Sequence, residues 1–197
     1  MNARRLKTVL LVAGLAASAL GLLAWTQPWF TVVLQTGQEL TVAGDAASGA
    51  LAALALSGLV LTGALAIAGA GFRLVLGILE VAIGALVVAS GLAALADPLR
   101  AVASSVTAAT AVTGEASVRA LVAALTATAW PVVACVAGVL LAITGIAVAV
   151  TFRRWPDTSR RYRRARFEPA ASDRTAVGDW DALSEGRDPT SPDDTSR

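Results

Sequence analysis

Four long apolar stretches constrain what this chain can fold into more than any other feature. They cover residues 8–25, 46–69, 74–96 and 131–151. At a rise of about 1.5 Å per residue, even the shortest helix of this kind crosses most of a hydrocarbon core roughly 30 Å thick. Charged residues make up 15% of the chain, against about 25% in an ordinary soluble domain. The sequence therefore predicts an all-α membrane protein with four transmembrane helices in a compact bundle within residues 1–151.

Arginine and lysine are unevenly distributed among the segments that flank these stretches. Basic residues precede the first stretch, follow the fourth, and occur at Arg73 between the second and third. Residues 26–45 contain no Arg or Lys, and residues 97–130 contain only Arg100 and Arg119. Connections rich in Arg and Lys stay in the cytoplasm. We therefore expect a multi-pass protein of the plasma membrane with both termini cytoplasmic.

The first apolar stretch also has features of a secretory signal peptide. Basic residues precede it, and Ala17-Ser18-Ala19 is typical of a small-residue cleavage site. The apolar run continues to Trp25, however, which is too long for a usual signal core. Cleavage would also place the basic C-terminal segment outside, against the charge distribution. We favour a retained helix.

Tryptophans occur at the predicted membrane boundaries. Trp25 and Trp29 follow the first span, whereas Trp130 and Trp155 flank the fourth. Because indole rings prefer the headgroup level, an aromatic belt is favoured over a stacking site for an aromatic ligand.

The two outer connections predict different local structures. Residues 30–42 form two short apolar runs around a Gly-containing turn, which predicts a small outer hairpin. Asp45 is expected to cap the second span. Residues 117–129 have helical propensity, and we expect them either to extend the fourth span outward or to lie along the surface.

Small residues recur at four-residue spacing within the spans, which favours close helix packing because small side chains let backbones approach. The pattern predicts a compact bundle without identifying the helices that touch. The pairs are Gly14 with Ser18, Ala64 with Ala68, Gly145 with Ala149 and, as a weaker case, Gly84 with Val88.

Glu80 is the only charged residue inside the four stretches and is the candidate intramembrane functional residue. A charged group at the bilayer centre costs on the order of 3 kcal/mol on insertion scales. One interpretation is a protonatable or ligand-facing group in a cavity. The alternative, favoured by the sequence alone, is a carboxyl group that is protonated or snorkels toward Arg73, two turns away on much the same face.

Enzymatic chemistry is not expected. The chain has no histidine, and its single cysteine, Cys135, lies inside the fourth span. The commonest general base, a disulfide and a thiolate metal cluster are therefore absent from the sequence. We predict no catalytic residues, no metal and no cofactor.

The chain beyond the fourth span divides into two parts. Residues 152–167 form a basic juxtamembrane segment, and residues 168–197 are polar and acidic, which predicts a disordered cytoplasmic tail. Each arginine near an anionic leaflet contributes roughly 1 kcal/mol of attraction, so lipid contact is favoured over nucleic-acid binding. The candidate headgroup contacts are Arg153, Arg154, Arg160, Arg161, Arg163 and Arg164.

Trp180 and Leu183 form an apolar island in the acidic tail. They share a face if a helical turn forms there. A docking motif for a cytoplasmic protein partner and a side chain that folds onto the protein's own bundle are equally weighted alternatives.

Short motifs mark the ends of the spans and the tail. They are Leu23-Ala24-Trp25 with Pro28-Trp29, Thr41-Val42-Ala43-Gly44, Phe72-Arg73, Ala129-Trp130-Pro131, Arg153-Arg154-Trp155-Pro156 with Ser159-Arg160-Arg161-Tyr162, and Trp180-Asp181-Ala182-Leu183 through Gly186, Asp188, Pro189 and Thr190. In this order they resemble the actinobacterial tryptophan-biosynthesis-associated membrane protein family. The resemblance implies about four spans and genes encoded beside those of tryptophan synthesis, and it brings no established catalytic residues. Glu80 matches no motif of that family.

Three functional hypotheses remain. The first is a membrane-anchored interaction or regulatory protein associated with tryptophan biosynthesis, which accounts for the tail. The alternative is a small permease or exporter of an aromatic amino acid or related metabolite. It requires a homo-oligomer, because four helices make a thin wall around a solute path. The third is a bundle-stabilising or envelope role unrelated to tryptophan.

Overall fold

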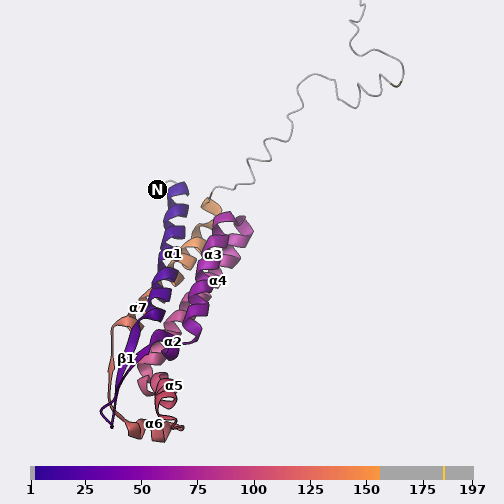
Figure 1. The fold of residues 1–197 in the computed structure, drawn as a ribbon. Helices are drawn as coiled ribbons and strands as arrows, with labels where there is room; N and C mark the ends of the chain where they lie inside the picture. The colour runs from indigo at the N-terminus through magenta and orange to yellow at the C-terminus, as the bar shows by residue number, and fades with distance from the viewer. Residues whose placement is uncertain (1–2, 156–183, 185–197) are drawn as a thin grey trace, which may run out of the picture. The chain divides into compact units, whose positions relative to one another are not determined.

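The computed structural model describes residues 3–155 and residue 184. Within this part, four helices are long and apolar enough to cross a membrane, and they lie side by side (Figure 1). Successive spans run in opposite directions, so the predicted four-helix membrane architecture is confirmed. The spans are α1 (Ala3–Thr26), α3 (Ala50–Ile67), α4 (Ala70–Ala96) and α7 (Trp130–Thr151).

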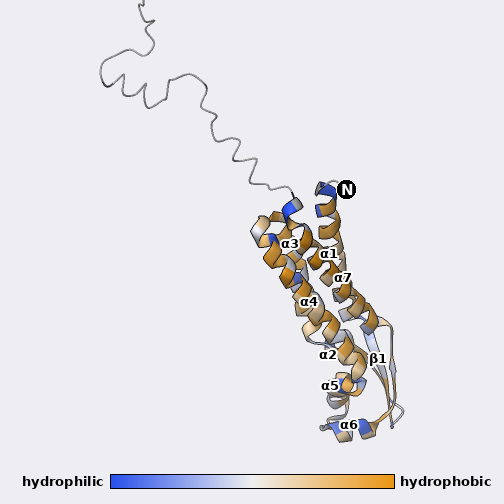
Figure 2. Cartoon of the chain, turned by 180° about the vertical axis from the view of Figure 1, so that it is seen from behind, coloured by the Kyte–Doolittle hydropathy of each residue, from blue (hydrophilic) through white to orange (hydrophobic). Residues whose placement is uncertain are grey.

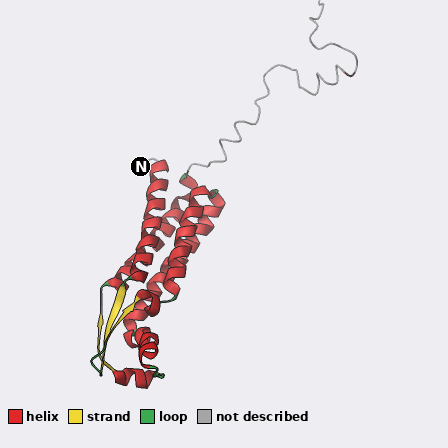
Figure 3. Ribbon diagram, in the orientation of Figure 1, coloured by secondary structure: helices red, strands yellow, loops and turns green. Residues whose placement is uncertain are grey.

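The other elements gather mostly at one end of the bundle, which we call the sheet end (Figure 3). They are β1 (Pro28–Leu34), β2 (Glu39–Ala43), α2 (Gly44–Ala47), α5 (Pro98–Thr110), α6 (Glu115–Leu121) and β3 (Val122–Ala127). The opposite end carries Lys7, Arg73 and the 3₁₀ turn η1 (Phe152–Arg154), and we call it the basic end. Figure 2 shows apolar spans between polar residues at the two ends.

A three-stranded antiparallel sheet, in the order β2-β1-β3, covers the sheet end. The predicted hairpin is confirmed as β1 and β2, with Val32 opposite Leu40. The prediction of a helix over residues 117–129 is wrong for residues 122–127, which form β3 and pair with the other edge of β1. Helical propensity of this Ala-rich segment is weak compared with the backbone hydrogen bonds that β1 offers.

The predicted cap at Asp45 is also wrong. Asp45 lies inside α2, where its Oδ1 accepts a hydrogen bond from the Ala46 N–H at 2.7 Å. The span α3 begins only at Ala50. Gly44 N donates to the Gln27 carbonyl oxygen at 3.0 Å, so this extra turn is tied to the end of α1.

The larger apolar core lies at the sheet end rather than midway along the spans. β1 supplies its centre, with Trp29, Phe30 and Val32 wholly buried, and α5 covers it with Val102 and Val106. This core fixes the sheet to the adjacent ends of the spans. A smaller cluster at the basic end contains Leu65, Val148 and Trp155.

Candidate functional site

Helices α4 and α7 meet in backbone contact along a line of glycines, which we call the glycine seam. A Cβ atom built at Gly84 would lie 2.6 Å from the Gly138 carbonyl oxygen, and one at Gly145 would lie 2.7 Å from the Gly77 carbonyl oxygen. These glycines recur at seven-residue intervals on each helix. The four-residue spacing in the sequence identified Gly84 and Gly145 but not Gly138 and Gly77, which they contact. Residues seven apart stay on one face of a helix over several turns, so the seven-residue spacing is the one that marks the seam.

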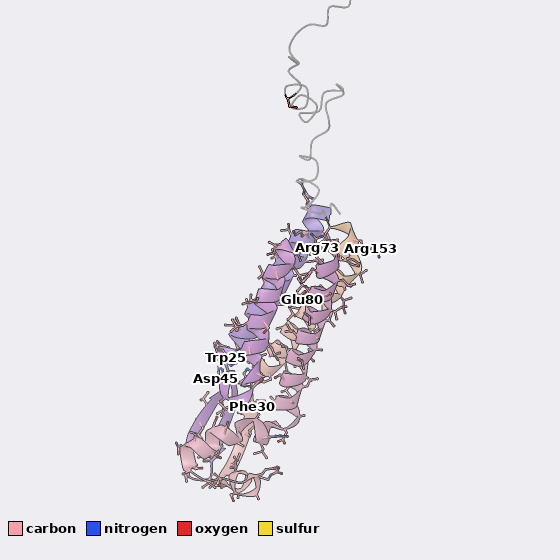
Figure 4. All side chains as sticks on the ribbon, turned by 90° about the vertical axis from the view of Figure 1, so that its right-hand side faces the viewer. Trp25, Phe30, Asp45, Arg73, Glu80 and Arg153 are labelled. Atoms are coloured by element: carbon pink, nitrogen blue, oxygen red, sulfur yellow. The ribbon has the colours of Figure 1, made fainter. Side chains whose placement is uncertain are left out.

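Glu80 lies on the buried face of α4, between two glycines of the seam, and is only 1% exposed. Its Oε1 and the Thr62 hydroxyl of α3 form a hydrogen bond of 3.0 Å. The backbone of α1 closes over it, since a Cβ atom at Gly14 would lie 2.9 Å from Oε1. Figure 4 shows Glu80 along the spans, between Arg73 at the basic end and Trp25 toward the sheet end.

Two more buried hydroxyl groups complete a polar cluster to which every span contributes. Thr144 of α7 donates to the Leu141 carbonyl oxygen at 2.7 Å and is also a neighbour of the Glu80 carboxyl group. Ser18 of α1 is 2% exposed and lies against Gly58 of α3, where a Cβ atom would be 2.7 Å from its Oγ. The Gly58 carbonyl oxygen in turn bonds to Thr62. We call Ser18, Thr62, Glu80 and Thr144 the polar cluster. Within residues 3–155, neither Ser18 Oγ nor Glu80 Oε2 has a hydrogen-bond partner.

Glu80 therefore does not snorkel toward Arg73. Its carboxyl group bonds to α3, whereas the Arg73 guanidinium lies 5.3 Å from the centre of the Trp155 ring. The sequence placed both residues on one helix face, which is correct, but it could not show that α3 and α7 offer closer hydroxyl partners.

The aromatic-belt interpretation is wrong for two of the four boundary tryptophans. Trp29 is wholly buried and donates from Nε1 to the Ala24 carbonyl oxygen at 2.7 Å. Trp155 is 3% exposed and lies under two cations, with Lys7 Nζ 5.9 Å and Arg73 Cζ 5.3 Å from its ring centre. Each ring fills a gap between elements, which outweighs the headgroup preference of an isolated indole.

Lys7 also joins two spans at the basic end. Its ammonium group donates to the Ala66 carbonyl oxygen near the end of α3, at 2.7 Å. Trp155 Nε1 donates to Thr151 Oγ1 at 3.2 Å. The start of the basic segment is thereby attached to α1, α4 and α7 together.

The remaining candidate residues are placed only in part. Arg153 is exposed, and its guanidinium lies 5.5 Å from the centre of the Phe152 ring. Its contact with lipid headgroups stays a prediction. The Arg154 side chain lies outside the described part of the chain. So do Arg160, Arg161, Arg163, Arg164, Trp180 and Leu183.

Two hollows at the sheet end were not expected from the sequence. One, of about 390 Å³, lies between the starts of α3 and α5 and is lined by Ser48, Ser90 and Arg100 among others. The other, of about 350 Å³, is lined by α5 and α6. Asp97 and Arg100 line both. Asp97 Oδ1 caps α5 by accepting from the Arg100 N–H at 3.1 Å. In the sequence, Arg100 was notable only as one of two basic residues in 97–130.

The described residues contain no group of three or more His, Cys, Asp or Glu side chains that could hold a metal ion. The polar cluster has a single carboxyl group and three hydroxyls. The carboxyl group can exchange a proton or accept hydrogen bonds from the hydroxyls.

Apolar spans, a buried polar cluster and a small sheet-bearing domain at one end define an integral membrane protein with four spans. A family described as tryptophan-associated transmembrane proteins matches residues 9–190. The chain belongs to this family, and the resemblance seen in the short motifs is confirmed. No curated protein and no solved structure matches it significantly.

Proposed function

We propose that the protein is a membrane-anchored interaction or regulatory protein of tryptophan biosynthesis. Membership of the tryptophan-associated transmembrane family supports the metabolic link. The packing of the bundle supports interaction over transport.

The observation that carries this proposal is the close approach of the spans. At Gly84 the α7 backbone leaves no room for even a methyl group. The contact of α1 with α3 is similarly close, since a Cβ atom at Gly58 would lie 2.7 Å from Ser18 Oγ. A solute of amino-acid size would have to separate helices at both contacts, so one copy of this bundle is poorly suited to transport.

The partner we propose is a cytoplasmic protein that binds Trp180 and Leu183. The distribution of Arg and Lys favours a cytoplasmic tail. The family match extends to residue 190 and so includes both residues. An indole and a leucine entering one apolar pocket supply most of the affinity of a short segment, and the nearby acidic residues steer it toward a basic surface.

The first experiment compares cells with and without the gene. Unchanged flux of aromatic amino acids and indole, with altered abundance or location of a tryptophan-pathway enzyme, is the result we expect. A flux change without any change in those enzymes would contradict the proposal.

The second experiment tests the docking residues. Crosslinked complexes are recovered from detergent-solubilised membranes containing either the wild type or the double variant Trp180→Ala, Leu183→Ala. We expect a tryptophan-pathway enzyme to be recovered with the wild type and lost from the double variant, at equal membrane insertion. Recovery of the same proteins with both would remove the docking site. The double variant Ser184→Ala, Thr190→Ala is the control, because it leaves the apolar pair intact.

A homo-oligomeric permease is the second candidate, favoured by the buried Glu80 carboxyl group. The outward faces of the spans are apolar, with Val60, Phe72 and Val75 exposed, and are suited to contact with lipid or a second copy. Loss of flux in Glu80→Gln, at unchanged protein level, would place this candidate first.

A further inference from the structure

We propose that Glu80, Thr62 and Thr144 form a proton-binding site inside the bundle, in which Glu80 is held as a neutral carboxylic acid. The site is independent of the proposed partner. It rests on the number of hydrogens available, on burial and on the distribution of charge around Glu80.

The hydrogen bonds around Glu80 need more protons than the two threonines can supply. Thr62 Oγ1 lies 2.8 Å from the Gly58 carbonyl oxygen and 3.0 Å from Glu80 Oε1, but it has one proton. Thr144 likewise donates to the Leu141 carbonyl oxygen while lying near the same carboxyl group. A carboxylate only accepts, so each threonine would have to share its single hydroxyl proton between the carboxylate and a helix carbonyl oxygen. A carboxylic acid brings its own proton and can donate it to a threonine oxygen.

Compensating charge around Glu80 is lacking on every span that packs against it. Within the spans, α3 has no titratable group and α7 has only Cys135, whose thiol lies near the Val88 carbonyl oxygen. On α1 the basic groups are at its first two turns, and Lys7 bonds to Ala66. Arg73, on α4 itself, lies beside Trp155 at the basic end. A carboxylate at 1% exposure would thus be a charge without a facing counter-ion, and charges of that kind are rare within membranes.

The packing favours a proton over a metal cation. A metal ion bound to the carboxyl group would need further oxygen ligands around itself, and space for them. At Gly14 of α1 a Cβ atom would lie 2.9 Å from both Glu80 Oε1 and Thr62 Oγ1, so the space on that side is too small even for a methyl group. A proton needs no additional space. Since all four spans contribute to the cluster, release of the proton would charge the centre of the bundle and weaken the contacts between α1, α3 and α4.

Infrared spectroscopy of the full chain in lipid vesicles tests this assignment. We expect a carboxylic-acid carbonyl band at neutral pH that shifts on deuterium exchange and is absent from Glu80→Gln. Glu39→Gln is the matched control and should keep the band, because Glu39 is exposed on β2. Thr62→Val should move the band to higher frequency, because one hydrogen-bond partner is lost.

Absence of the band from the wild type at neutral pH would overturn the proposal. A band that disappears when sodium or potassium is added at constant pH would overturn it in favour of a metal-cation site. If Glu80→Gln fails to fold, the pH dependence of the wild-type band tests the proposal. We expect the carboxylic-acid band to be present at neutral pH and to be replaced by carboxylate bands at alkaline pH. A band that does not change with pH would count against the site.

Discussion

At the scale of single residues, the partner of each indole N–H distinguishes tryptophans that look alike in the sequence. Trp29 is wholly buried and bonds to Ala24, whereas Trp25 is half-buried and its Nε1 has no partner within residues 3–155. Gly44 packs against both, since a Cβ atom there would lie 2.7 Å from Trp29 Nε1 and from the Trp25 carbonyl oxygen. The two tryptophans therefore differ in what their N–H groups contribute to stability.

Replacement of Trp29 by Phe should lower the melting temperature of the purified protein. The change removes one buried hydrogen bond, worth about 0.5–1.5 kcal/mol. The Ala24 carbonyl oxygen keeps only the Gln27 N–H, at 3.2 Å. Trp25→Phe is the matched control and should be neutral or slightly stabilising, because it removes an N–H that lacks a partner. Equal losses from the two variants would refute the role of the Trp29 hydrogen bond.

At the scale of secondary-structure elements, the glycine seam sets the distance between α4 and α7. Gly77, Gly84 and Gly91 lie on one face of α4, so the closest contacts follow a heptad along the whole span. Gly63 of α3, by contrast, has open space around its Cβ position. The same residue type therefore serves different purposes in neighbouring helices.

Gly84→Ala should destabilise the bundle by about 1–3 kcal/mol, the usual cost of overpacking. Gly63→Ala shares the same gain in helix propensity but meets no neighbour, so it should be neutral or stabilising. Resistance to unfolding in sodium dodecyl sulfate, followed by circular dichroism, measures both. A Gly84→Ala variant as resistant as Gly63→Ala would mean that the two helices can separate freely.

At the scale of the whole molecule, the two ends of the bundle differ in charge. Arg73 and Arg153 lie at the basic end (Figure 4), where Lys7 is beside Trp155. The sheet end has Arg100 and Arg119 beside Asp97 and Glu115. This asymmetry supports a cytoplasmic basic end and an external sheet domain.

Cysteine labelling of intact cells with an impermeant reagent tests this orientation. In a Cys135→Ala background, Gln38→Cys and Thr113→Cys should be labelled, and Thr175→Cys should be labelled only after lysis. Gln38 and Thr113 are exposed, and they avoid the adjacent Gly37 and Gly114, whose φ angles of +83° and +97° disfavour other residues. Labelling of Thr175→Cys in intact cells would show that the topology is the reverse of the one expected.

The sequence alone determined the four spans, the hairpin of β1 with β2 and the family. Each depends on information that lies within a short segment: hydropathy over about 20 residues, alternation around a turn, or a short motif. Glu80 was also identified from sequence, because a charge in an apolar run stands out without any knowledge of its neighbours.

Only the tertiary structure decided what surrounds those residues. The pairing of β3 with β1 joins segments about 95 positions apart, and the polar cluster combines one side chain from each span. Burial of Trp29 and Trp155 depends on Gly44, Lys7 and Arg73 arriving from other elements. A residue's own hydropathy gives its preference for membrane or water, whereas its hydrogen-bond and packing partners depend on which distant segments the fold brings beside it.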